Sequence, residues 1–216
     1  NSSGFPSDGS AGDIIIKAQT GAIDGNNLVA VGGGVINVNG QNNAAGGKIN
    51  ISFASGNVTL ALASSNGGPT AGTSDAGVGG GINITTGNGY INITTITSAG
   101  GSQSTAPTNV GGRGGDINLN ASQDIVATTV NASGGLSTTG GKGGDVTINA
   151  SNLIQINGIF STGGEATMWP RNGGSVFVHA TTAINVTTID TQGGQDINNG
   201  DNSGSGANAG TVLVSL

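Results

Sequence analysis

Short segments in which two aliphatic residues flank a single residue recur seven times along the chain. The middle residue is polar in most copies, so apolar and polar positions alternate, as in a β-strand with one buried face. The first residues of successive segments are 35, 33, 35, 29, 30 and 36 positions apart. The segments are Ile14–Ile16, Ile49–Ile51, Ile82–Ile84, Ile117–Leu119, Val146–Ile148, Val176–Val178 and Val212–Val214. This spacing predicts a repeat protein in which every repeat opens on a strand.

A second apolar segment follows the first in five of the repeats, at Val58–Leu60, Ile91–Ile93, Ile125–Val126, Ile154–Ile156 and Ile184–Val186. Third apolar positions follow at Leu62, Ile96, Val130, Ile159 and Ile189, before a glycine-rich stretch. Each repeat is therefore expected to hold three short strands and three corners, the third corner being long. The first repeat is the least regular. There Ile23, Leu28 and Val31 take the later positions, and Val35–Val38 adds an extra apolar segment.

One repeat cannot bury its aliphatic face alone, whereas stacked repeats can place these residues in columns. Glycine and β-branched residues dominate every segment, which disfavours helices. We therefore predict an all-β fold, a parallel β-helix (β-solenoid) of about six full coils of 29–36 residues plus a terminal strand. Residues 1–11 are expected to form an N-terminal corner or linker, and residues 12–216 a single solenoid.

Composition removes several classes of protein. Glycine takes 44 of 216 positions, but only 7% of residues are charged and the aliphatic residues are regularly spaced, so a disordered linker is not expected. With a net charge of −6 and five lysines and arginines, we expect no nucleic-acid partner. There are no cysteines and no apolar run of membrane-spanning length. A chain that begins at Asn1, without Met or a signal sequence, is expected to be a processed product or an excised segment.

Two Gly-Gly-Asp corners, ending at Asp116 and Asp145, are the candidate metal sites. Their glycines partly fit calcium-binding nonapeptide repeats, but Asn118 and Thr147 stand where a large apolar residue is required. A cation precedes each aspartate by three residues, Arg113 and Lys142 respectively. We therefore expect a charge ladder, no metal and no cofactor, with calcium at the two aspartates as the alternative.

Threonine and asparagine recur at equivalent places in several repeats. The pairs Thr94–Thr95, Thr128–Thr129 and Thr187–Thr188 would suggest ice binding, but Asn157–Gly158 interrupts the array. Strand propensity and bonding of the hydroxyl groups to the backbone are the simpler interpretation of these threonines. Asn50, Asn83 and Asn118 occupy the outward position of three consecutive opening strands, where stacked amides can form a stabilising ladder.

No strand core carries the paired carboxylates that solenoid enzymes acting on polysaccharides use, so we do not expect an enzyme. His179 is the single histidine, and nothing nearby in the sequence makes it part of a triad. Met168–Arg171 is the one stretch that combines aromatic and cationic character. Trp169 could stack on a sugar, dock a neighbouring subunit or cover the adjacent coil, and Arg171 lies beside it as a possible ligand or partner contact.

The run Gly114–Ser122, together with Val130–Gly135, resembles the repeat region of filamentous-haemagglutinin-like exoproteins, many of them cyanobacterial. The resemblance covers the chain from about Gly12 to Leu216, although the Gly-Gly-Asp motif is common to glycine-rich solenoids. It implies a right-handed β-helix, secretion to the bacterial cell surface, and adhesive or matrix roles. It carries over no catalytic residue, and the domain that directs secretion of these proteins does not precede the repeats.

The two ends of the predicted solenoid look complementary. The chain opens on what reads as the corner that ends a coil, and its last segment, Thr211–Leu216, is only the first strand of another. Unpaired strand edges template further pairing, so we expect a head-to-tail homopolymer with Val212, Val214 and Phe5 at the interface. The predicted function is an extracellular structural solenoid, a fibre subunit or adhesin stalk. A carbohydrate- or ice-binding module is the alternative, with cell-surface carbohydrate as a possible partner.

Overall fold

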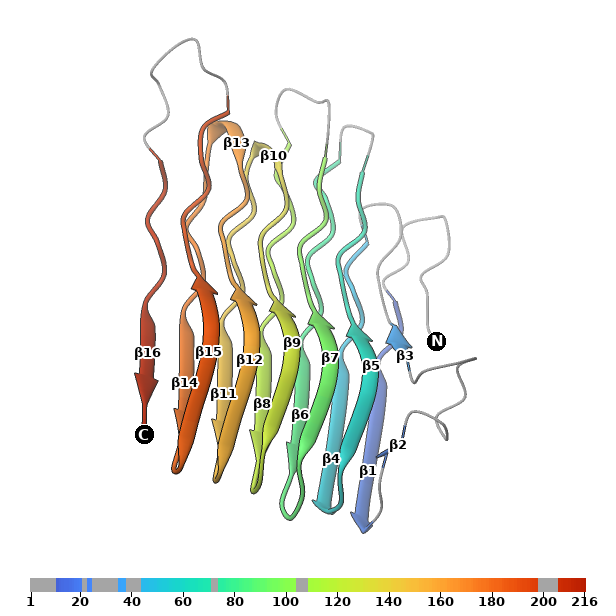
Figure 1. The fold of residues 1–216 in the computed structure, drawn as a ribbon. Helices are drawn as coiled ribbons and strands as arrows, with labels where there is room; N and C mark the ends of the chain where they lie inside the picture. The colour runs from blue at the N-terminus through green and yellow to red at the C-terminus, as the bar shows by residue number, and fades with distance from the viewer. Residues whose placement is uncertain are drawn as a thin grey trace.

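The computed structural model describes residues 11–20, 23–24, 35–37, 44–70, 74–103, 109–197 and 206–216. Two parallel sheets face each other, and the chain passes from one to the other as it advances along the molecule (Figure 1). Among the described residues there is no helix, and hence none that could cross a membrane. The predicted all-β parallel solenoid is confirmed.

The first sheet contains the opening strands, and its spatial order is the order of the chain. Its strands are β1 (Ile14–Thr20), β4 (Ile49–Ser55), β6 (Ile82–Thr86), β8 (Ile117–Ala121), β11 (Val146–Ala150), β14 (Val176–Ala180) and β16 (Val212–Ser215). Every pair is parallel and in register, so that Ile82, for example, pairs with both Ile49 and Ile117. The seven opening strands predicted from the sequence are therefore all present.

The second sheet packs against the first. Its strands are β2 (Ile23–Asp24), β3 (Val35–Asn37), β5 (Val58–Ser64), β7 (Ile91–Thr97), β9 (Ile125–Asn131), β12 (Leu153–Phe160) and β15 (Ala183–Asp190). The coils that begin at β4, β6, β8, β11 and β14 each contribute one strand to each sheet. The first coil is described only at β1, β2 and β3. Of the predicted N-terminal corner, only Ala11 belongs to the described residues.

Each coil has two long strands where three short ones were predicted, because the second and third apolar segments belong to one strand. In β7 the buried residues are Ile91, Ile93 and Ile96, so the alternation skips a residue halfway. The pairing register skips Thr94 at the same place. A strand whose inward face shifts in this way no longer follows a strict period of two, and its sequence reads as two elements.

The third column is also filled differently from the prediction in the first two coils. Ala63 pairs with Ile96 and is fully buried, whereas Leu62, the predicted residue, pairs with Thr95 and is only partly buried. Ile36 pairs with Ala63, so β3 supplies the third position of its coil and is not an extra segment. Leu28 and Val31 lie outside the described residues.

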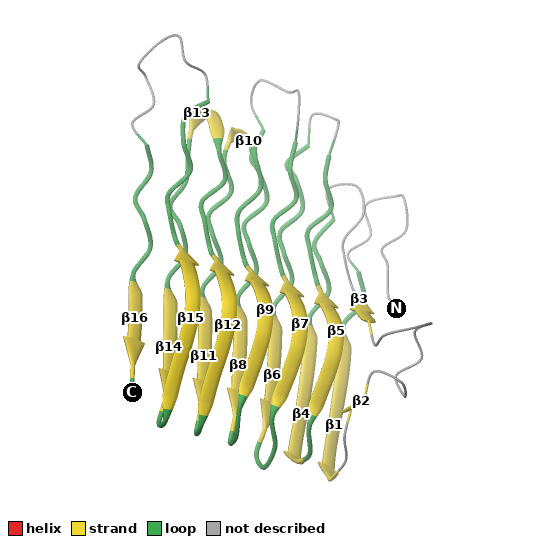
Figure 2. Ribbon diagram, viewed as in Figure 1, coloured by secondary structure: helices red, strands yellow, loops and turns green. Residues whose placement is uncertain are grey.

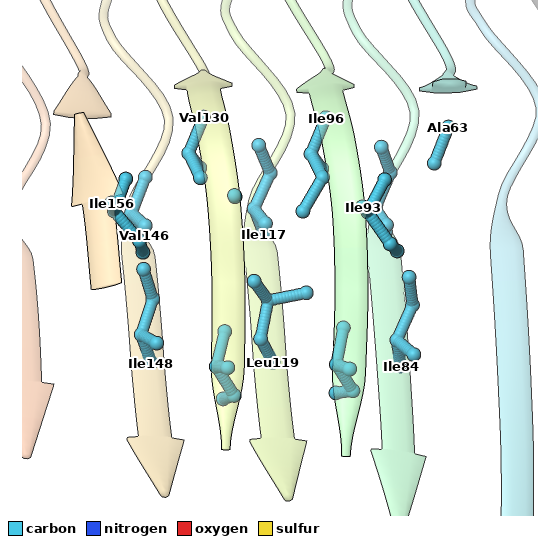
Figure 3. Packing of buried hydrophobic residues seen from close by; sticks show 14 of the residues in the cluster. Ala63, Ile84, Ile93, Ile96, Ile117, Leu119, Val130, Val146, Ile148 and Ile156 are labelled. Atoms are coloured by element: carbon cyan, nitrogen blue, oxygen red, sulfur yellow. The ribbon is translucent and has the colours of Figure 1, made fainter. Parts of the chain in front are cut away.

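The core is a set of aliphatic columns between the two sheets (Figure 3). The largest side chains in it are at most 1% exposed, and Ile84, Ile93, Ile96 and Ile117 are at 0%. Each fully buried aliphatic side chain contributes about 1.5–3 kcal/mol to folding. Because the columns run through all coils, no coil has a core of its own.

A glycine-rich arm extends every coil beyond the sheets. We use this name for the stretches that connect a strand of the second sheet to the next strand of the first, drawn mainly as green loops in Figure 2. In two coils the arm contains short strands, β10 (Ser137–Thr139) and β13 (Ala166–Trp169), which pair in parallel. The outgoing and returning halves of the arm lie against each other without side chains between them.

Backbone hydrogen bonds hold the two halves together. Gly77 N–H donates to Gly68 C=O within one coil, and Gly101 N–H donates to Gly77 C=O across to the previous coil. The alternation continues from Ala44 to Gly164 as one zigzag of bonds 2.7 to 2.9 Å long, through Gly68, Gly77, Gly101, Gly112, Gly135 and Gly141. A Cβ atom on Gly112 would lie 1.8 Å from the carbonyl oxygen of Gly77, so the contact requires glycine.

We expect Ile84→Asp to abolish folding, because it places an unpaired charge in a dry core, at a cost of about 4–5 kcal/mol or more. Circular dichroism and thermal melting measure this. The control Asn83→Asp adds the same charge at the exposed neighbouring position and should change stability by under about 0.5 kcal/mol. A wild-type spectrum and melting point for Ile84→Asp would show that the register is wrong.

We expect Gly112→Ala to destabilise the protein by about 1–3 kcal/mol or more, because backbone atoms surround the new methyl group. Gly81→Ala is the matched control, since the nearest atom to its Cβ would be Asp116 O, 3.8 Å away. Denaturant midpoints compare the two. Equal midpoints would contradict the close packing of the arm.

Candidate functional site

The Gly-Gly-Asp corners place their carboxylates against the backbone of the following coil. Asp116 Oδ1 accepts the N–H of Asp145 at 2.9 Å, and Asp145 Oδ1 accepts the N–H of Ser175 at 2.8 Å. Arg113 Nη2 lies 2.6 Å from Asp116 Oδ1 and 3.9 Å from Asp145 Oδ2. The two aspartates therefore cap successive coils, and one arginine balances both charges.

The predicted pairing of Lys142 with Asp145 is wrong: Lys142 is exposed and forms no ion pair within the described part of the chain. The side chains of Arg113 and Asp116 are 43% and 47% exposed, so their bond contributes only about 0–1 kcal/mol. Among the described residues no three His, Cys, Asp or Glu side chains gather into a metal site. Calcium at Asp116 and Asp145 stays a prediction to be tested.

Trp169 and Arg171 lie where the arm turns back toward the sheets. Trp169 ends β13, is 60% exposed, and accepts the N–H of Gly140 on its backbone carbonyl at 3.0 Å. Arg171 lines a shallow hollow of about 330 Å³ with Arg113, Lys142 and Asp75, over a floor of arm glycines. Trp169 is not part of this hollow, so the structure does not bring the two predicted contact residues into one site.

The polar columns on the outer faces follow the predicted register. Asn83 pairs with Asn50 and Asn118, and Thr129 pairs with Thr95 on one side and Gly158 on the other. The threonine array is therefore interrupted in the coil of β12, as the sequence indicated. The outer faces remain flat, with polar residues repeating along the axis.

His179 offers no catalytic arrangement. Its Nδ1 lies 3.0 Å from the hydroxyl of Ser215 in the next coil, on the exposed side of the first sheet. No acidic residue shares an interaction with it among those described for this side chain. That the protein is not an enzyme therefore stays a prediction.

An apolar hollow lies at the C-terminal end of the solenoid, between β15 and β16. It has a volume of about 510 Å³, and its lining consists of Ile184, Val186, Ile189, Val214, Ser215 and Leu216. We call these residues the C-terminal groove. Val212 and Val214 pair with Val176 and Val178, and so continue the aliphatic column as predicted, yet they are 45% and 47% exposed. Phe5, the third predicted interface residue, lies outside the described residues.

Several residues of this end were not singled out by sequence reasoning. Leu213 is 54% exposed, Leu216 74%, and Ile184 is only partly buried although its equivalents in earlier coils are fully buried. The signal was available in Leu213 and Phe177, apolar residues at the outward position that asparagine fills in the middle coils. Of the eleven large apolar residues that are exposed in the described part of the chain, eight lie at position 168 or later.

No family model, curated protein or solved structure matches the chain. Function is therefore inferred from the described residues and their geometry.

We expect equal melting temperatures in excess chelator and in excess calcium, because Arg113 and backbone N–H groups already occupy the oxygens of Asp116 and Asp145. Differential scanning calorimetry under both conditions makes the comparison. A large rise in stability with calcium that Asp116→Asn abolishes would establish the calcium alternative.

Proposed function

We propose that the chain is an extracellular structural β-solenoid, a fibre subunit or adhesin stalk that assembles end to end. The observation that carries the proposal is the C-terminal groove, an apolar surface at the point where the core columns reach the end of the described chain. Contiguous exposed apolar surface of this kind marks an interaction site. A surface that continues a core is suited to a partner that continues the same core.

The shape of the molecule supports a structural role. Coils stack about 4.8 Å apart, so the described coils form a rod roughly 30 Å long. Every coil bonds to its neighbours through both sheets and through the arm, which ties the rod together along three lines. Such a rod is a rigid spacer whose length grows with each subunit added. The surface location is supported by the resemblance to exoprotein repeats.

A carbohydrate- or ice-binding module is the second candidate. The flat polar columns and the exposed ring of Trp169 favour it, because repeated hydroxyl and amide groups can match a periodic ligand. The break at Asn157–Gly158 counts against ice, and the mixed charges of Asp75, Arg113, Lys142 and Arg171 offer no field of a single sign at the hollow.

We expect the purified protein to form filaments by electron microscopy, and Val214→Asp to leave single rods, because the new charge would have to be buried at the junction. Circular dichroism should be unchanged, since Val214 lies at the edge of the last coil. The control Asn118→Asp adds the same charge to an exposed position in the middle of the rod and should still form filaments.

Sedimentation across a concentration series quantifies the same equilibrium. A wild-type protein that stays monomeric at high concentration would reject end-to-end assembly. Filaments of Val214→Asp with wild-type stability would show that the C-terminal groove is not the contact.

A further inference from the structure

We propose that the end-to-end contact has one fixed register, in which β16 of one copy pairs in parallel with β1 of the next, so that Val212, Leu213 and Val214 lie beside Ile14, Ile15 and Ile16. This inference rests on the proposed end-to-end assembly and specifies the partner as a second copy of this chain. Four features of the described residues lead to it.

The first feature is the outward column, by which we mean the residues at the middle position of the opening strands. In register these are Ile15, Asn50, Asn83, Asn118, Thr147, Phe177 and Leu213. The column is polar in the four middle coils and apolar at both ends, where Ile15 is 61% exposed, Phe177 40% and Leu213 54%. Stacking in the proposed register places Leu213 beside Ile15 and joins the two apolar ends into one stripe.

The second feature is the matching deficit of burial at the two ends. Ile14 and Ile16 at one end, and Ile184, Val186 and Ile189 at the other, are only partly buried. Their partners one coil inward, such as Ile49 and Ile154, are 0% exposed. Each end therefore lacks the cover of one neighbouring coil, and another copy of the chain supplies a coil of the same dimensions.

The third feature is a regular hydrogen bond between coils. The first residue of an opening strand donates its N–H to the carbonyl of the residue that precedes the next opening strand: Ile14 to Lys48, Ile82 to Asp116, and Val176 to Thr211, at 2.8 to 2.9 Å. Applied once more, the rule makes Val212 N–H the donor and Asp13 C=O of the next copy the acceptor. The strand β16 pairs only with β14, and β1 only with β4, within the described chain.

The fourth feature excludes other registers. A shift of one residue would turn Val212 and Val214 away from the core, because side chains alternate between the two faces of a strand. A shift of two residues would set Leu213 beside Asp13 or Lys17, the charged residues on either side of Ile15 on the same exposed face. Only the proposed register pairs apolar residues with apolar residues on both faces.

A chain without cysteine allows a direct test by disulfide formation. Adjacent parallel strands in register place their Cα atoms about 4.8 Å apart, within the range of about 4.4–6.8 Å that a disulfide needs. We expect oxidised Ile15→Cys/Leu213→Cys to give a ladder of covalent multimers on a denaturing gel, lost on reduction. Lys17→Cys/Leu213→Cys moves one thiol two residues along the strand, about 6.6 Å, and should give no ladder.

Three controls define the outcomes. Phe177→Cys/Leu213→Cys joins register partners within one chain, so it should form a disulfide without a ladder and establishes that β16 is folded and oxidisable. Ile15→Cys mixed with Leu213→Cys should give covalent dimers only. Leu213→Cys alone should give none, and dimers from it would overturn the proposal in favour of tail-to-tail pairing.

The remaining results separate the register from the assembly. Wild-type filaments without a ladder from Ile15→Cys/Leu213→Cys, or with an equal ladder from Lys17→Cys/Leu213→Cys, would overturn the register and leave end-to-end assembly standing. Absence of both filaments and ladder, with the Phe177→Cys/Leu213→Cys disulfide formed, would overturn both.

Discussion

Parallel pairing of each coil with its equivalents before and after it is the interaction on which the structure depends. Because the register is kept across seven strands of the first sheet, aliphatic residues fall on aliphatic residues and the core becomes a continuous column. The same register brings the carboxylate of Asp116 to the backbone of the next coil and aligns Asn50, Asn83 and Asn118 on the outside. Local features of the molecule are thus set by a repeat that no single coil could maintain.

The arm shows how this constraint shapes composition. Two halves of backbone approach so closely that neighbouring carbonyl oxygens occupy the space where Cβ atoms of Gly77, Gly112 and Gly141 would lie. Glycine is required there by packing and not by an unusual dihedral angle. The hydroxyl groups of Ser65, Ser98 and Ser161 bond to arm carbonyls in their own coils and secure the junction between arm and sheets. The high glycine content therefore indicates order in this chain.

The fold class, the opening strands and their register could be predicted from the sequence, because few folds besides a solenoid repeat one buried face every 29 to 36 residues. The joined second strand could not, since the shift at Thr94 breaks the alternation and Ala63 is too small to stand out beside Leu62. The arm was expected to be a loop, because glycine-rich sequence carries no sign of its own hydrogen-bond partners. Of the candidate sites, Val212 and Val214 were predicted from the unfinished repeat. The remainder of the C-terminal groove depends on the position of β15, which only the structure supplies.

The strands lie across the long axis of the rod, and this orientation determines how it responds to tension. Force applied along the axis separates one coil from the next, so the coils detach in sequence from an end and do not share the strain. A coil occupies about 4.8 Å of the rod. Once detached and stretched, its 29 to 36 residues span roughly 100 Å. A surface fibre made of this protein would therefore lengthen about twentyfold for each coil released, absorbing mechanical work before any covalent bond is loaded.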